Sequence, residues 1–166
     1  MSRIDNEAAL LYNIIMRRKD RQRDEKFALE IADKCEWAVL SVVNPEGLPY
    51  SVPLSIARNG NELYFHAAKE GLKTECLNRN PNVCVVCVGD TERRADKFTT
   101  KYESAVIRGK AAQITDDKAK IEALGFICRR HAESNMAEFD DYARRYLDRT
   151  AVWKITIEEI TGKCNE

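Results

Sequence analysis

The sequence lacks an excess of either charge and any long apolar run. Lys plus Arg and Asp plus Glu number 27 each, so the net charge is close to zero. A nucleic-acid-binding domain usually carries a basic excess that neutralises phosphates, so no nucleic-acid partner is expected. No apolar stretch approaches the roughly 20 residues that cross a bilayer, so no membrane partner is expected either.

The chain also lacks the marks of secretion and of a cysteine framework. Its first basic cluster follows an apolar stretch instead of preceding it, which is the wrong order for a secretory signal. Six scattered cysteines indicate reduced thiols, so a cytoplasmic protein is expected. Cys84 and Cys87 form a CxxC pattern inside an apolar strand, where residues three apart face opposite sides, so both are interpreted as core residues and no metal site is predicted. The sequence shows no clear basic partner for Cys35, Cys76 or Cys128, so no reactivity is assigned to them.

Apolar periodicity divides 166 residues, the size of one domain, into helices and strands. Asn44 to Gly47 and Arg58 to Asn61 are predicted turns, and the charged segment 89–100 is predicted to be a loop. Thr115 is predicted to cap the helix that follows it. The predicted helices are 5–16, 24–34, 71–79, 116–131 and 136–147, and the predicted strands are 37–43, 48–57, 62–68, 82–88, 104–114 and 151–160.

This pattern predicts an α+β fold with about six mostly antiparallel strands. A small barrel suits many short strands, because closure hides their edges. Pro53 inside a strand indicates an edge or a bulge. Trp37 and Trp153 are predicted to be core residues, and His131 is interpreted as a charge that complements the end of a helix.

The segment LYFHAAKEGLK places chemistry at a strand-to-helix junction. Alternation puts Leu63, Phe65 and Ala67 inward, so His66 points outward. Lys69, Gly71 and Lys73 surround the start of the helix, where unpaired N–H groups favour an anion. An ordinary surface turn and a phosphate site both fit these residues, and on this segment alone the surface turn is favoured.

A larger set of motifs resembles a known family. The motifs, in chain order, are MRRKDR, PYSVPLS, NELYFHAAKEGLK, LNRNPNVCV, YESAVIRGKA and KITIEEITGK. Their order and spacing resemble the FMN-binding split-barrel superfamily that includes pyridoxamine 5′-phosphate oxidase. Within it, the sequence is most similar to the nitroimidazole-resistance type of flavoprotein. Residues 1–22 are predicted to form an N-terminal helical extension, most of which the resemblance does not explain, and residues 23–166 are predicted to form a single split-barrel flavin-binding domain. The implied fold is a six-stranded antiparallel split β-barrel with flanking helices.

The resemblance also implies a function. Two FMN molecules would lie between the subunits of a homodimer, with a strand edge along the flavin ring and the strand-to-helix junction at the phosphate. His66 would be a catalytic proton donor to a small-molecule substrate, such as a nitroaromatic compound, in an oxidoreductase. A nicotinamide compound is a possible electron donor, although no GxGxxG motif is present. The implied cofactor-binding residues are Val52, Pro53, Leu54, Ser55, His66, Ala67, Ala68, Lys69, Gly71, Lys73, Tyr102 and Ser104.

Two other functions stay open. Haem-handling proteins use the same barrel, and His66 and His131 are the only histidines able to supply an axial ligand. A sensor that binds flavin without turnover needs no catalytic residue. FAD or a deazaflavin in place of FMN is a further alternative.

Overall fold

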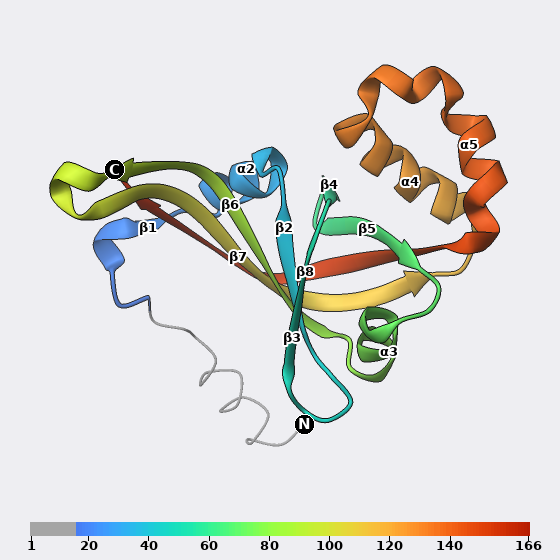
Figure 1. The fold of residues 1–166 in the computed structure, drawn as a ribbon, viewed down its shortest axis with the longest axis horizontal. Helices are drawn as coiled ribbons and strands as arrows, with labels where there is room; N and C mark the ends of the chain where they lie inside the picture. The colour runs from blue at the N-terminus through green and yellow to red at the C-terminus, as the bar shows by residue number, and fades with distance from the viewer. Residues whose placement is uncertain (1–15) are drawn as a thin grey trace.

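The computed structural model describes residues 16–166 (Figure 1), so the helix predicted over 5–16 lies almost entirely outside the described residues. One antiparallel sheet dominates the fold, and helices connect or cover its strands. The strands are β1 (Gln22–Arg23), β2 (Ala38–Val43), β3 (Pro49–Leu54), β4 (Ala57–Asn59), β5 (Glu62–Ala68), β6 (Asn82–Arg94), β7 (Thr99–Ile114) and β8 (Thr150–Asn165), and the α-helices are α2 (Glu25–Lys34), α3 (Leu72–Arg79), α4 (Asp117–His131) and α5 (Phe139–Tyr146).

The order of the strands explains why the sheet is a split barrel. Neighbours follow the order β3-β2-β6-β7-β8-β5-β4, with the short β1 beside β8. The edge strands β3 and β4 are consecutive in the chain and are joined only by Ser55 and Ile56. A connection this short spans at most about 11 Å, so the two edges must lie near each other and the sheet must curl. No pairing joins β3 to β4 among the described residues, which leaves the split. The predicted fold class is confirmed, and so is the edge position of Pro53.

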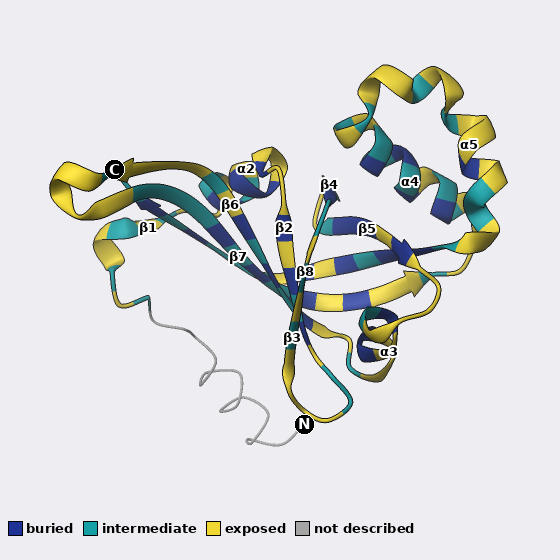
Figure 2. Cartoon of the chain, viewed as in Figure 1, coloured by how far each residue is buried: buried dark blue, intermediate teal, exposed yellow. Residues whose placement is uncertain are grey.

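Buried and exposed residues alternate along several strands (Figure 2), and the buried residues form the core of the barrel. Leu63, Phe65 and Ala67 of β5 are buried, as predicted. The Phe65 ring stacks on Trp153 of β8, with ring centroids 6.4 Å apart and planes 7° apart. Trp153 is 2% exposed, which confirms its predicted place in the core.

Helix α2 packs against β6, β7 and β8. Its first turn is capped by the Asp24 carboxylate, which accepts a hydrogen bond from the N–H of Phe27 at 2.8 Å. Ala28, Ile31 and Ala32 form its buried face. Helical periodicity alone predicted this element, because one face is apolar and the other is charged.

The connection from β7 to β8 contains α4, a 3₁₀ segment (Glu133–Glu138) and α5 (Figure 1). Ile114 at the end of β7 pairs with Val152 of β8, so the chain leaves and re-enters the sheet at adjacent positions. Helix α4 packs over the outer face of β5, where Ala123 and Ile127 contact the cluster that contains Tyr64. Tyr64 therefore points away from the barrel interior and is still buried. No helix among residues 16–166 is long and apolar enough to cross a membrane.

Several predicted boundaries were wrong. The predicted loop 89–100 is mostly strand, because β6 runs to Arg94, β7 starts at Thr99, and only a short turn separates them. Both faces of this two-stranded arm are largely exposed, so its sequence has no alternating apolar pattern. The predicted strand 48–57 is interrupted at Ser55 and Ile56. The cap of α4 is Asp116 instead of Thr115, and its carboxylate accepts from the N–H of Ala119 at 2.8 Å.

The orientation of β2 was also predicted wrongly. Trp37 is 59% exposed, and Val39 lies on the same outer face. Ala38, Leu40 and Val42 face the core instead. Both alternating sets of this strand are largely apolar, so periodicity predicts a strand here and does not say which face is buried.

Candidate functional site

The junction between β5 and α3 leaves the start of a helix without a side-chain cap. Gly71 occupies the N-cap position with φ of 120°, and no side chain accepts a hydrogen bond there. Nothing lies within 4 Å of the place where a Cβ on Gly71 would be. The Thr74 hydroxyl donates to the Ala68 carbonyl at 3.1 Å, which ties the first turn of the helix to the end of the strand. This arrangement offers free backbone N–H groups to an anion.

Lys73 adds a half-buried positive charge in that first turn. Its Nζ lies 5.8 Å from the centre of the Phe65 ring, a cation–π geometry that holds the side chain against the end of the barrel. Burial lowers the pKa of the Lys73 amine below its usual value. Within residues 16–166, no carboxylate lies within salt-bridge distance of it. A bound anion would therefore supply the missing countercharge.

His66 lies on the outward face of β5, as predicted, directly across the ladder from Val152. The imidazole is exposed in the single chain, but the protein atoms around it still remove part of its solvation. This burial is the main cause that lowers the pKa of His66, and the positive charges of Lys73 and His131 lower it further. The ring is therefore mainly neutral near pH 7 and lies in an electropositive setting.

His131 ends α4, in agreement with its predicted position at a helix terminus. Its Nε2 lies 2.7 Å from the carbonyl oxygen of Ile56, in the connection between the two edges of the split. One ring nitrogen is thus occupied by the backbone. His66, by contrast, has no hydrogen-bond partner within the described part of the chain.

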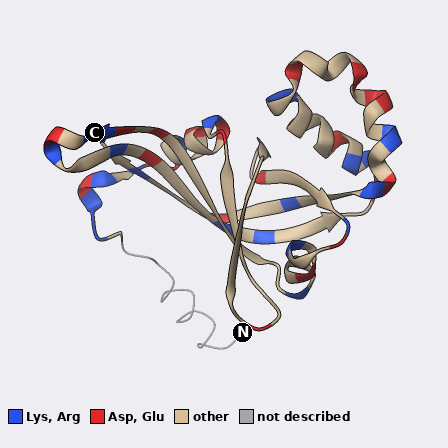
Figure 3. Ribbon diagram, viewed as in Figure 1, with Lys and Arg blue, Asp and Glu red and all other residues tan. Residues whose placement is uncertain are grey.

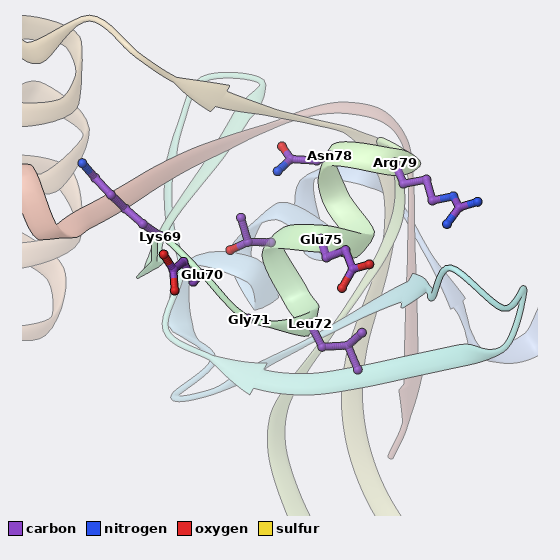
Figure 4. Close-up of a pocket in the computed structure, with 8 residues that line it drawn as sticks. Lys69, Glu70, Gly71, Leu72, Glu75, Asn78 and Arg79 are labelled. Carbon is purple, nitrogen blue, oxygen red and sulfur yellow. The ribbon is translucent and has the colours of Figure 1, made fainter.

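A hollow of about 570 Å³ lies on another side of the same helix (Figure 4). Lys69 and Gly71 line it together with the carboxylates Glu70 and Glu75, whereas His66 and Lys73 do not. Arg79 also lines the hollow, so its two carboxylates offset the positive charges of Lys69 and Arg79. Lys73, in the first turn of α3, has no carboxylate partner among residues 16–166 and is therefore the better candidate for binding an anion. The structure therefore separates Lys69 from the other basic residues predicted around the junction.

The predicted ring-binding residues lie along the edge strand β3. Val52 and Leu54 are half-buried and pack against the core, while Pro53 is exposed and pairs with Val39 of β2. Because β3 has a ladder partner on one side only, part of its backbone is free toward the split. Ser55 follows in the connection to β4 and is also half-buried. An edge with unpaired backbone groups suits a planar ligand that accepts and donates hydrogen bonds.

Tyr102 and Ser104 lie far from this junction in the single chain. Ile114 of β7 and His66 of β5 both pair with Val152 of β8, so they lie at the same level of the sheet. Tyr102 is 12 positions before Ile114 on β7, which places Tyr102 roughly 30–40 Å from His66 along the strands. Figure 1 shows this end of β7 beside the C-terminus, opposite α3. Burial opposes ionisation of Tyr102, but Arg21 and Lys163 outweigh it, so the pKa of the phenol is lowered. The fold of one chain therefore does not bring all the predicted site residues together.

The outer face of β2 and β6 is an exposed apolar surface. Trp37, Val39 and Val88 are exposed members of it, and they border a cavity of about 460 Å³. Figure 3 shows that β2 and β3 carry no Lys, Arg, Asp or Glu. Apolar surface of this kind is typical of a contact between proteins. This surface was not predicted from the sequence, because Trp37 was expected to lie in the core.

The cysteines agree in part with the predictions. Cys84 and Cys87 face opposite sides of β6, and all six thiols are free. Residues 16–166 contain no cluster of three or more His, Cys, Asp or Glu side chains arranged to bind a metal ion. Cys35, however, has a basic partner that the sequence did not reveal. The Nη2 of Arg130, 95 positions away, lies 3.7 Å from its sulfur.

Comparison with known proteins identifies the family. A 5-nitroimidazole antibiotic resistance protein from Bacteroides thetaiotaomicron has 28% identity and a TM-score of 0.72, over 87% of this chain and 89% of that one. An FAD- and haem-binding protein from Mycobacterium smegmatis (22% identity, TM-score 0.76, 88% and 74% covered) and a flavocytochrome from Azotobacter vinelandii (21%, 0.70, 92% and 72%) share the fold. A search of curated proteins gives no match. The sequence profile of pyridoxamine 5′-phosphate oxidase matches residues 24–164, so the chain belongs to this family of split-barrel proteins.

Proposed function

We propose that the protein is a flavin-dependent oxidoreductase that binds FMN between the subunits of a homodimer. The uncapped, glycine-led start of α3, with Lys73 in its first turn and no carboxylate partner for Lys73 among residues 16–166, is the observation that carries this proposal. Membership of the family supports a flavin, and the similarity to a nitroimidazole-resistance protein supports a nitroaromatic substrate.

The phosphate is assigned to the His66 side of α3. Backbone N–H groups after Gly71 and the ammonium group of Lys73 would hold it, since hydrogen bonds that involve an ionised group are shorter and stronger than neutral ones. The open space above Gly71 fits a close approach of phosphate oxygens to the backbone. Ala67 and Ala68 end the strand with small side chains, which leave room beside the phosphate.

The flavin ring is assigned to the edge of β3. Backbone groups of Val52, Pro53 and Leu54 and the hydroxyl of Ser55 would orient it, and the bound flavin would supply the redox chemistry. Pro53 has no N–H, so at that position the edge can only accept a hydrogen bond.

His66 is assigned the proton-handling role. Its lowered pKa keeps the imidazole neutral near pH 7, and a neutral imidazole can both accept and donate a proton. Its outward position leaves it open to a small molecule. A nicotinamide electron donor would need only transient contact with the exposed side of this site.

The homodimer is assigned to the outer apolar face. Contact between two copies through Trp37, Val39 and Val88 would remove this surface from water. A second copy would also bring its own Tyr102 and Ser104, which lie far from the junction within one chain. This arrangement accounts for a cofactor site whose predicted residues are divided between two ends of the fold.

The first experiment is the visible spectrum of the freshly purified protein, followed by heat release and chromatography of any chromophore. Two broad flavin bands and released FMN would support the proposal, and released FAD would correct the cofactor. A colourless protein that does not bind added FMN would overturn it. Bound flavin without turnover of any reducible substrate, nitroaromatic or other, would indicate the sensor.

Haem binding is the second candidate. Two proteins of the same fold bind haem according to their descriptions, an FAD- and haem-binding protein and a haem-binding protein from Mycobacterium smegmatis. His66 is outward and unpartnered in the described residues, whereas His131 is held by Ile56, so His66 is the candidate axial ligand. A sharp Soret band in the same spectrum, lost in His66→Ala, would favour haem over flavin.

A further inference from the structure

The last turn of α4 places two consecutive basic side chains against the main chain of other elements. The Arg130 guanidinium donates to the carbonyl oxygens of Ala32 and Cys35 at 2.9 and 2.8 Å, at the end of α2. Nε2 of His131 lies 2.7 Å from the carbonyl oxygen of Ile56, in the connection between β3 and β4. A carbonyl oxygen can only accept, so Nε2 carries the proton and donates it. One helix end therefore holds two separate segments of the barrel.

These two segments lie at the same end of one ladder. Leu54, the last residue of β3, pairs with Ala38, the first residue of β2. Cys35 lies three residues before Ala38, and Ile56 lies two residues after Leu54. The two basic side chains of α4 thus hold the chain on both sides of the point where the ladder of β2 and β3 ends.

The connection between β3 and β4 has few other means of fixing its main chain. Ser55 and Ile56 belong to no strand, and among residues 16–166 no main-chain N–H donates to the carbonyl oxygen of Ile56. The Ile56 side chain is 1% exposed and anchors the connection in the core. Apolar packing is non-directional, whereas a hydrogen bond requires a defined angle. His131 therefore sets the orientation of this peptide group.

We infer that His131 is a positioning residue for the flavin ring. By fixing the peptide group of Ile56, it sets the direction in which the chain leaves β3, and with it the place of Ser55 and of the end of the ring-binding edge. The inference rests on the proposed function, because the ring is assigned to that edge. Arg130 supports the same edge from the other side, since β2 is the ladder partner of β3.

A residue that positions the ring differs in its effect from one that holds the phosphate. FMN and riboflavin share the ring, and only FMN carries the phosphate. Loss of the His131 contact should therefore weaken the binding of both compounds by the same factor. Loss of the Lys73 charge should weaken the binding of FMN alone.

Hydrogen–deuterium exchange of the full-length protein without cofactor tests the contact itself. In His131→Ala, the amides of residues 54–57 should exchange about 2- to 10-fold faster, the factor that corresponds to one net hydrogen bond. His131→Gln can donate an amide proton to the same carbonyl and should restore most of the protection. Arg129→Gln removes a positive charge from the same turn, where the side chain lies over Phe126, and should change nothing. Unchanged exchange in His131→Ala would overturn the inference.

A shorter amide separates reach from chemistry. His131→Asn carries the same amide group as His131→Gln on a side chain that is one carbon shorter, so it should behave like His131→Ala. If the alanine variant does not fold, the comparison of His131→Asn with His131→Gln decides. Equal exchange in these two variants would contradict a contact that depends on reach to Ile56.

Titration of the same variants with FMN and with riboflavin tests the consequence. His131→Ala should weaken both affinities by about 2- to 10-fold, and His131→Gln should recover most of the loss, with circular dichroism that matches the parent. A loss for FMN alone would place His131 at the phosphate and overturn the inference. Unchanged affinities in His131→Ala would overturn the inference while the proposed function stands. A parent protein that binds neither compound overturns both.

Discussion

At the scale of single residues, the site depends on which charges have partners. Lys73 has no carboxylate partner in the described residues, and its positive charge lowers the pKa of His66, whereas Lys69, four positions before Lys73, lies beside two carboxylates. The sequence does not distinguish the two lysines, but in the fold only Lys69 lines the hollow that contains Glu70 and Glu75.

Replacing Lys73 tests the phosphate site. Lys73→Gln should weaken FMN binding by roughly 10- to 100-fold, because a charged hydrogen bond contributes about 1.5–3 kcal/mol. Riboflavin, which has no phosphate, should bind the variant and the parent equally. Lys69→Gln is the matched control and should leave both affinities unchanged. Equal losses for FMN and riboflavin would show that Lys73 does not act on the phosphate.

The pKa of His66 tests the same cluster without any activity. Since the folded-state pKa is lowered, the unfolded chain binds this proton more tightly. The stabilisation linked to His66 is therefore present above about pH 6.5 and is lost as the pH falls toward the lowered pKa. In Lys73→Gln, NMR titration should show the His66 pKa moving upward, toward its usual value. A pKa unchanged by this substitution would place Lys73 away from the imidazole.

At the scale of elements, the predictions from the sequence were most accurate for helices and strands that bury one face and expose the other. The apolar face of α2, the turn from Arg58 to Asn61 and the alternation along β5 were all predicted correctly. The arm formed by residues 89–100 was missed, because strands exposed on both faces need no apolar alternation. The face of β2 was missed because both of its sets of side chains are apolar. The pairing of Cys35 with Arg130 joins residues 95 positions apart, which local patterns do not report.

The cap of α4 gives a prediction at this scale. Asp116→Ala should lower the free energy of unfolding by about 1 kcal/mol, because the N–H of Ala119 loses its acceptor. Thr115→Ala, at the position that the sequence favoured, should change it by less than about 0.5 kcal/mol. Urea denaturation measures both. A larger effect at Thr115 would restore the original prediction.

At the scale of the whole molecule, the candidate site is divided. The junction of β5 with α3 and the positions of Tyr102 and Ser104 lie at opposite ends of one chain, and the apolar face lies on β2 and β6. The barrel itself was predictable from the sequence, because the motifs occur in order along the chain. The assignment of Tyr102 and Ser104 to the site rests on the family resemblance and stays a prediction. Their separation from the junction within one chain was not predictable, because it follows from strand lengths that the sequence understated.

The proposed homodimer depends on the apolar face. Trp37→Asp should convert the dimer to a monomer and weaken FMN binding with it, because an unpaired carboxylate in an apolar contact is costly. Sedimentation velocity with an FMN titration measures both effects. Tyr142→Asp, on the exposed surface of α5, is the control and should remain dimeric. If the Trp37→Asp variant is still a dimer, the interface lies on a different surface of the protein.

The pairing of Ile114 with Val152 has a consequence for how this fold can diversify. The polypeptide between them, with α4 and α5, begins and ends at neighbouring points of one ladder, so a tight hairpin could replace it without changing the register of β7 and β8. The segment between Ile114 and Val152 can therefore be exchanged while the pairing of β7 with β8 is kept. Its removal would expose the apolar patch around Tyr64 on β5 and would take away the contacts of Arg130 and His131 with the backbone carbonyls of Ala32, Cys35 and Ile56. Related chains can therefore vary this cover while the paired strands of the sheet stay the same.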